Sequence, residues 1–310
     1  MLPICISLLS FLNPFAALSA PLEKPVQVKF EAILEEIPPR HFYLVSNLRK
    51  LLEKYTDEEL VRIYQDFSEL KEETFAQASK QLDYIVTAGG PGAGKSTAIE
   101  RLMESGNCPD PTVEKGIIRA YIDPDRTCLL KMKHTYNADI DSGVRTPEEA
   151  YTKWRDASNF LANGYLAIAL RDGYAIAHGS TMATPYAKNA LTAIRDLYGY
   201  RTTILHLTCS DEIRRASDAL RRKNGVVQCT EKDFVEKQAL FLTLLSDYIQ
   251  YSDNVLFCLR KNLEETVWTA KLEKGVLTLY DPEALQKIEE VHNAAQGPGF
   301  WEKVFYSVSK

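Results

Sequence analysis

One eight-residue segment has the residue types and the spacing of a phosphate-binding loop. Residues 89–96 read Gly-Gly-Pro-Gly-Ala-Gly-Lys-Ser and fit the pattern G-x-x-x-x-G-K-[ST]. Glycines let backbone N–H groups surround phosphate oxygens where a Cβ atom would collide with them. We expect Lys95 to reach the outer phosphates of ATP and the Ser96 hydroxyl to ligate Mg²⁺. The residues expected to bind the nucleotide are Gly89, Gly90, Pro91, Gly92, Ala93, Gly94, Lys95, Ser96 and Thr97.

The neighbours of this P-loop segment support the same interpretation. Residues 84–88 form an apolar run of strand type directly before it. Residues 97–102 continue as a helix, whose positive N-terminus would face the bound anion. A clear guanine-reading N/T-K-x-D motif is absent from the sequence, which weakens a GTPase interpretation.

A pair of carboxylates follows the second predicted strand. Residues 116–122 are of strand type and end at Asp123-Pro124-Asp125. In doubly wound sheets ligands bind beyond the carboxyl ends of the strands, so both carboxylates should approach the γ-phosphate. One of them could accept the proton of an attacking hydroxyl group. The alternative is an Asx turn or a helix cap, but next to a P-loop we favour the functional interpretation.

A cluster of cations lies on or just after one predicted helix. Arg221 and Arg222 stand before a glycine-containing loop, where a lid over the transferring phosphoryl group could begin. Arg214 and Arg215 are interpreted as a solvated helix face, and Lys223 completes the cluster. The histidines form no metal set: His178 ends a strand near the presumed site, and His206 is expected to be a core residue with a satisfied ring.

Strands alternate with helices over most of the chain, which predicts a mainly parallel sheet covered on both faces. The expected class is α/β, a P-loop NTPase three-layer sandwich with an N-terminal helical region and a C-terminal hairpin–helix extension. The predicted division is a leader at 1–20, helices at 21–80, the P-loop domain at 81–262 and the extension at 263–310. Further strands are expected at 174–178, 202–207, 255–259, 265–272 and 276–280, and helices at 147–172, 186–198, 211–223, 231–250 and after 281.

The composition excludes several classes of protein. The chain has 310 residues and a net charge of −5, which argues against binding nucleic acid mainly through its phosphate backbone. Its six cysteines include no C-x-x-C pair and are interpreted as reduced thiols.

Residues 1–20 carry no charge and are mostly apolar, which fits a signal or export segment as well as a merely apolar leader. No Lys or Arg precedes the apolar run, and prolines interrupt it, so no stable membrane span is expected. Activity is expected in the cytoplasm, with export through the leader as the open alternative.

The chain resembles the zeta toxin family, P-loop kinases of toxin–antitoxin systems that phosphorylate UDP-N-acetylglucosamine. The resemblance covers residues 84–259 and includes the P-loop and Ile122-Asp123-Pro124-Asp125. It continues through Ser158-Asn159, the glycines of 173–181 and 199, and Arg221. It implies that Asp125 is the general base for the sugar hydroxyl, that Thr181 lies at the sugar site and that Arg221 binds phosphate from the lid. The expected catalytic set is Lys95, Asp125 and Arg221.

Three positions depart from the family pattern. Asn163 stands where the family often has a glutamate in the long helix, and is the expected substrate-binding residue there. The glutamate at the end of the third strand falls on His178 or Gly179, and the second lid arginine falls near Gln228. Arg222 or Lys223 could supply the missing lid charge.

The departures leave three functions open. The first is a kinase that transfers the ATP γ-phosphate to a nucleotide sugar, with an antitoxin-like partner or with the N-terminal helices shielding the ATP site in cis. The second is the same chemistry on another sugar, a nucleoside or a polynucleotide end. The third is a degenerate ATP-binding interaction module.

Overall fold

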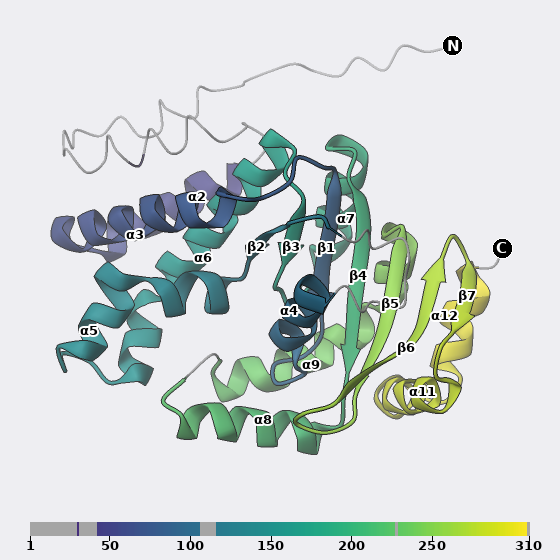
Figure 1. The fold of residues 1–310 in the computed structure, drawn as a ribbon. Helices are drawn as coiled ribbons and strands as arrows, with labels where there is room; N and C mark the ends of the chain where they lie inside the picture. The colour runs from purple at the N-terminus through teal and green to yellow at the C-terminus, as the bar shows by residue number, and fades with distance from the viewer. Residues whose placement is uncertain (1–29, 31–41, 106–115, 227–228, 309–310) are drawn as a thin grey trace, which may run out of the picture.

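A single seven-stranded sheet organises the chain in the computed structural model, which describes residues 30, 42–105, 116–226 and 229–308 (Figure 1). The strand order is β2-β3-β1-β4-β5-β6-β7, and the first five in this order are parallel. Strand β6 is antiparallel to β5, and β7 is antiparallel to β6. The strands are β1 (Asp83–Ala88), β2 (Ala120–Ile122), β3 (Ile176–His178), β4 (Arg201–Thr208), β5 (Asn254–Arg260), β6 (Thr266–Glu273) and β7 (Val276–Leu279).

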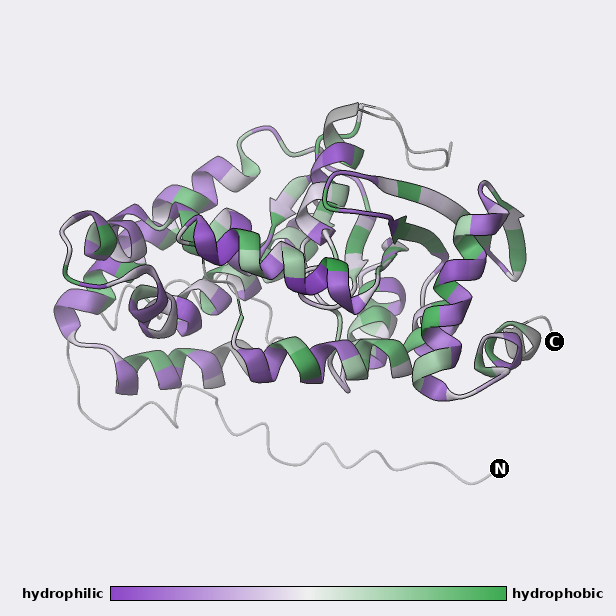
Figure 2. Ribbon diagram, turned by 90° about the horizontal axis from the view of Figure 1, so that it is seen from below, coloured by the Kyte–Doolittle hydropathy of each residue, from purple (hydrophilic) through white to green (hydrophobic). Residues whose placement is uncertain are grey.

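Helices cover both faces of the sheet, because the central strands bury side chains on either side. Every residue of β1 is buried; Ile85 packs with Ile99 and Leu102 of α4 (Lys95–Ser105) on one face. On the opposite face Tyr84, Val86 and Ala88 join the larger core, to which the other long helices contribute. In Figure 2 the outer helices carry both hydrophilic and hydrophobic residues, as expected for helices that turn one side to a sheet. The predicted α/β P-loop sandwich is confirmed.

The long helices begin where the capping pattern predicts. In α6 (Pro147–Asp172) the Thr146 side chain accepts a hydrogen bond from the Glu149 N–H, and the Glu149 side chain accepts one from the Thr146 N–H. Gly173 ends the helix with φ 70°. Thr56 and Glu59 form the same box before α3 (Asp57–Phe75). The remaining helices are α2 (Phe42–Lys54), α5 (Ala138–Asp141), α7 (Ala187–Thr192), α8 (Asp211–Lys223), α9 (Glu231–Thr243), α10 (Leu245–Tyr251), α11 (Pro282–Gln296) and α12 (Phe300–Val308).

Several element boundaries differ from those predicted. The helix expected at 231–250 is two helices, because the Leu244 N–H donates to the Phe241 carbonyl in a tighter turn that interrupts α9 and α10. The helix expected at 186–198 continues beyond α7 as a π-helical turn. Strands β2 and β3 are shorter than predicted, and α12 was not predicted.

The C-terminal hairpin extends the main sheet. Its two-residue turn places Lys274 at φ 49° and Gly275 at φ 78°, the left-handed conformations that a tight hairpin requires. Strand β6 pairs with β5 along its length, from Asn254 opposite Glu273 to Arg260 opposite Thr266. None of the described helices combines the length and the hydropathy needed to cross a bilayer.

The N-terminal helices α2 and α3 are part of the main core. Phe67 of α3 lies so close to α6 that a Cβ atom at Gly164 would be 3.1 Å from its ring. The Tyr165 hydroxyl donates to the Phe67 carbonyl at 2.8 Å, and Ile63 and Leu51 are buried in the same cluster. Deleting this block would therefore expose α6, so a deletion cannot separate shielding of the site from folding.

Two histidines lie in the core between β4 and α11. His206 and His292 are both fully buried, with ring centroids 5.1 Å apart. His206 is a core residue as expected, and its Nδ1 lies 3.4 Å from the Thr208 hydroxyl. Within the described part of the chain its Nε2 has no hydrogen-bond partner, so only one nitrogen of the ring is satisfied. Burial lowers the pKa of His292 to about 4 and lowers that of His206 well below its ordinary value.

These histidines predict a loss of stability in mild acid. In the unfolded chain these two histidines bind protons at about pH 6.5, and in the native chain they do not. The free energy of unfolding should therefore fall as pH drops from about 6.5 to 4. Each histidine contributes a slope of about 1.4 kcal/mol per pH unit inside that window. Denaturant unfolding of His292→Phe at pH 7.5, 6.5, 5.5 and 4.5 should show a shallower decline than the original chain. Equal declines would contradict the assignment.

Candidate functional site

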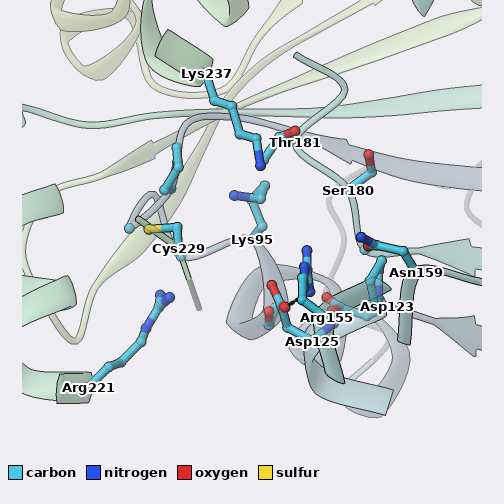
Figure 3. Close-up of a pocket in the computed structure, with 16 residues that line it drawn as sticks. Lys95, Asp123, Asp125, Arg155, Asn159, Ser180, Thr181, Arg221, Cys229 and Lys237 are labelled. Carbon is cyan, nitrogen blue, oxygen red and sulfur yellow. Dashed lines mark hydrogen bonds and ion pairs between the residues drawn. The ribbon is translucent and has the colours of Figure 1, made fainter. Parts of the chain in front are cut away.

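A cavity of about 230 Å³ lies at the carboxyl ends of the parallel strands, where the topology predicts a ligand site (Figure 3). We call it the P-loop cavity. The residues that line it are Pro91, Gly92, Gly94, Lys95, Ser96, Asp123, Pro124, Asp125, Arg155, Asn159, Gly179, Ser180, Thr181, Arg221, Cys229 and Lys237.

The P-loop adopts a conformation that its glycines permit. Gly92 and Gly94 have φ values of 80° and 86°, and a Cβ atom on Gly92 would lie 2.5 Å from the Arg214 carbonyl oxygen. The Lys95 ammonium donates to the Gly90 carbonyl at 2.9 Å. Burial, and then the positive charge of Arg221, lower the pKa of Lys95 to about 7. A phosphate in the cavity would reverse this effect, because an anion favours the charged form of the lysine.

Two buried arginines fasten the P-loop to the rest of the domain. Arg214 of α8 is 2% exposed, and its Nε donates to the Pro91 carbonyl at 3.0 Å. Arg260, at the end of β5, donates to the Gly92 carbonyl at 2.7 Å. The expectation of a solvated Arg214 was wrong, whereas Arg215 is solvated and pairs with Asp211 and Glu231. Only the packing of α8 distinguishes these adjacent arginines.

Asp123 is both a cap and a cavity residue. Its Oδ1 accepts hydrogen bonds from the backbone N–H groups of Asp125 and Arg126, each at 2.8 Å. The other side of its carboxyl group lies against Gly179, where a Cβ atom would be 2.6 Å from Asp123 Cγ. Burial raises the pKa of Asp123. The glycine that departs from the family pattern thus leaves the space that this carboxyl group fills.

Gly179→Ala should therefore displace Asp123. The added methyl group would overlap the carboxyl group, which must turn away and give up its caps on the 124–128 turn. We expect about a tenfold or greater loss of affinity for nucleotide in the presence of Mg²⁺, and a smaller loss in its absence. Calorimetric titration measures both. Gly143→Ala, at an exposed position outside the cavity lining where a Cβ atom would meet nothing within 4 Å, is the control. Equal affinities for the Gly179→Ala and original chains would disprove the assignment.

Asp125 lies across the cavity from the P-loop and forms an ion pair with Arg155 of α6 (Figure 3). Asn159 follows Arg155 by four residues, so both side chains leave the same face of the helix and line the cavity. Arg155 was missed as a site residue, and Asn159 had been noted only as part of the family pattern. Helical spacing from residue 155 could have found the pair once the inward face of α6 was known.

The structure brings most of the sequence-predicted residues to the cavity. Lys95, Ser96, Asp125, Thr181 and Arg221 line it. Thr181 is also tied to the P-loop, since its carbonyl accepts a hydrogen bond from the Gly89 N–H at 3.1 Å.

Other predicted residues lie outside the lining. Gly89, Gly90 and Ala93 belong to the loop without lining the cavity, and Thr97 is exposed. Asn163 lies one turn beyond Asn159 and does not line the cavity.

The remaining candidates also lie apart from the cavity. His178 does not line it, and its Nδ1 is 2.7 Å from the Tyr84 hydroxyl. Arg222 is held by Asp218 and by the Cys229 carbonyl. Gln228 and the leader at 1–20 fall outside the described residues. Of the described residues before β1, none lines the cavity, so α2 and α3 do not cover it.

The fold and the loop define a P-loop domain of the kind that binds nucleotides. The family profile described as AAA domain matches residues 85–241, about half of the chain, from β1 through α9. The chain belongs to this AAA domain family, in agreement with the resemblance drawn from its motifs. No curated protein matches the sequence.

Solved structures share the fold at low sequence identity. The complex AvrRxo1-ORF1:AvrRxo1-ORF2 with sulphate ions has a TM-score of 0.53 and 12% identity, covering 76% of this chain and 73% of that chain. The corresponding complex with ATP has a TM-score of 0.50, 14% identity and the same coverage. The PezAT toxin–antitoxin system of Streptococcus pneumoniae has a TM-score of 0.46 and 14% identity, covering 78% and 96%. The likeness to the AvrRxo1 complexes concerns the fold alone.

Proposed function

We propose that the protein is an ATP-dependent phosphotransferase that transfers the γ-phosphate to an alcohol, most specifically a sugar hydroxyl of UDP-N-acetylglucosamine. The observation that carries the proposal is the position of Asp125, which lines the same cavity as the P-loop residues Lys95 and Ser96. A domain that only binds ATP would use a carboxylate there to hold Mg²⁺, a role that this proposal gives to Asp123. A kinase needs one to receive the proton of the attacking hydroxyl.

Different residues of the cavity would stabilise the transferring phosphoryl group and accept the proton. Lys95 and Arg221 place positive charge where the transferring phosphoryl oxygens would lie, and this charge stabilises the transition state. Asp125 takes the proton as the acceptor oxygen bonds to the γ-phosphorus and the bond to ADP breaks. The Arg155 ion pair holds the Asp125 carboxylate in place.

The donor set fits Mg²⁺. The Ser96 hydroxyl and the Asp123 carboxyl group both line the cavity, and Mg²⁺ prefers such oxygen ligands, usually one or two from protein together with phosphates and water. When bound, the ion would neutralise charge on the outer phosphates. The raised pKa of the buried Asp123 fits a carboxyl group that awaits a cation.

The acceptor side of the cavity suits an anionic, hydroxyl-rich molecule. Arg155 offers a planar guanidinium suited to phosphate, and Asn159, Ser180 and Thr181 offer hydrogen bonds to sugar hydroxyls. A nucleotide sugar has both features. We also propose an antitoxin-like protein partner, since AvrRxo1-ORF1 is seen in complex with AvrRxo1-ORF2.

The test is phosphate transfer from γ-labelled ATP to UDP-N-acetylglucosamine by the full chain. Transfer that requires the added acceptor supports the proposal. A panel of other sugars, nucleosides and polynucleotide ends identifies a different acceptor if the nucleotide sugar gives no product. ATP binding without transfer to any of them would overturn the kinase and leave the nucleotide-binding module.

A further inference from the structure

One face of helix α9 reaches the core, the P-loop and the cavity at once. Phe234, Lys237, Gln238 and Phe241 follow the i, i+3, i+4, i+7 spacing of a single helix face. The two phenylalanines are buried, and Lys237 lines the cavity. Gln238 lies against the P-loop so closely that a Cβ atom on Gly90 would overlap its amide oxygen.

The position of this face relative to the P-loop is fixed by Arg214. Its Nε donates to the Pro91 carbonyl at 3.0 Å, and its Nη2 donates to the Phe234 carbonyl at 2.7 Å. The guanidinium also lies 4.1 Å from the centre of the Phe234 ring. The buried Arg214 therefore links α9 to the phosphate-binding loop. Lys237 lies one helical turn after Phe234, the residue of α9 that Arg214 contacts.

Positive charge exceeds negative charge in the P-loop cavity. Its lining includes four basic side chains, Lys95, Arg155, Arg221 and Lys237, against the carboxyl groups of Asp123 and Asp125, so basic groups outnumber acidic ones among the described residues. In Figure 3 the Lys237 ammonium points toward Lys95. Like charges held close together are costly unless an anion lies between them.

The ion pair that Lys237 makes is easily exchanged. Its Nζ is 3.3 Å from Asp233 Oδ1, and both side chains are more than one-third exposed. Such a pair on one helix contributes little to stability. A multiply charged phosphate would compete for the ammonium, because lysine is a mobile point charge that suits phosphate.

We propose that Lys237 is a further phosphate-binding cation, in addition to Lys95 and Arg221, which acts from α9 beside Lys95 on the outer phosphates of the nucleotide. This inference rests on the proposed function and offers a different source for the missing lid charge from Arg222 or Lys223, which the sequence suggested. Arg222 is engaged with Asp218 and Cys229, and Lys223 does not line the cavity. Lys237 is brought to the site from further along the chain, by a helix instead of the lid loop.

The test compares nucleotide binding by Lys237→Met, Lys237→Arg and the matched control Lys232→Met. Lys232 is on the same helix, its side chain is 79% exposed and its ion pair with Glu236 spans 3.9 Å. Loss of one charge-assisted hydrogen bond predicts that Lys237→Met binds ATP about ten- to a hundredfold more weakly. Binding of AMP, which lacks the outer phosphates, should change much less. Lys237→Arg should recover most of the ATP affinity, and Lys232→Met should match the original chain.

Calorimetry with ATP, AMP and inorganic triphosphate measures these affinities without any phosphate transfer. Equal ATP affinity in Lys237→Met and the original chain would overturn the inference. So would equal losses for ATP and AMP, since these would indicate a disturbed fold. If no acceptor is phosphorylated but Lys237→Met still weakens ATP and triphosphate selectively, the proposed function fails and the assignment of Lys237 stands.

Discussion

Asp125→Asn should abolish phosphate transfer and leave ATP binding intact. An amide cannot accept the proton of the attacking hydroxyl, and loss of a positioned general base lowers turnover by about 10²–10⁴-fold. The substitution keeps the size of the side chain, and the Asp125 carboxylate is outside the P-loop, so the contacts of the loop are retained. The measurement is transfer from γ-labelled ATP, with ATP affinity determined on the same preparations.

The control for this substitution is Asp141→Asn. Asp141 is an exposed carboxylate on the short helix α5 and does not line the cavity. It should retain full transfer. Turnover by Asp125→Asn at the rate of the Asp141→Asn control would remove Asp125 from the mechanism, whatever the acceptor.

The second large effect is expected at Arg214, where the adjacent arginine provides the comparison. Arg214→Met leaves the carbonyl groups of Pro91 and Phe234 without their donor in a buried position. We expect a loss of about 2–5 kcal/mol in the free energy of unfolding. Arg215→Met removes exposed ion pairs and a cation–π contact with the Phe234 ring at 5.1 Å, and should change the stability by about 1 kcal/mol or less.

The two arginine variants should also differ in nucleotide binding. Without Arg214 the P-loop loses one of its two arginine anchors, so ATP affinity should fall along with stability. Denaturant titration and calorimetry, both at neutral pH, measure the two effects. If Arg214→Met and Arg215→Met lost the same stability, the anchoring role of Arg214 would be refuted.

Short-range patterns were sufficient to predict most of the fold. The P-loop, the strand before it and the helix after it are encoded within twenty residues, so no distant contact is needed to recognise them. The capping boxes at Thr56 and Thr146 gave the starts of two helices for the same reason. The break between α9 and α10 was not predicted, because no glycine or proline marks Leu244 and the tight turn there carries no strong local signal.

By itself, the sequence determined that this is a mainly parallel α/β P-loop domain with a carboxylate pair after its second strand. Only the tertiary structure decided which side chains reach the P-loop or its cavity. Arg214 contacts the loop where Arg215 does not, Asn159 lines the cavity where Asn163 does not, and Lys237 of α9 lines it where Arg222 of α8 does not. The physical reason is that a helix spreads its residues around its whole circumference. Which of them turn inward depends on how the helix packs against the sheet and the P-loop, and residues distant in the sequence set that packing.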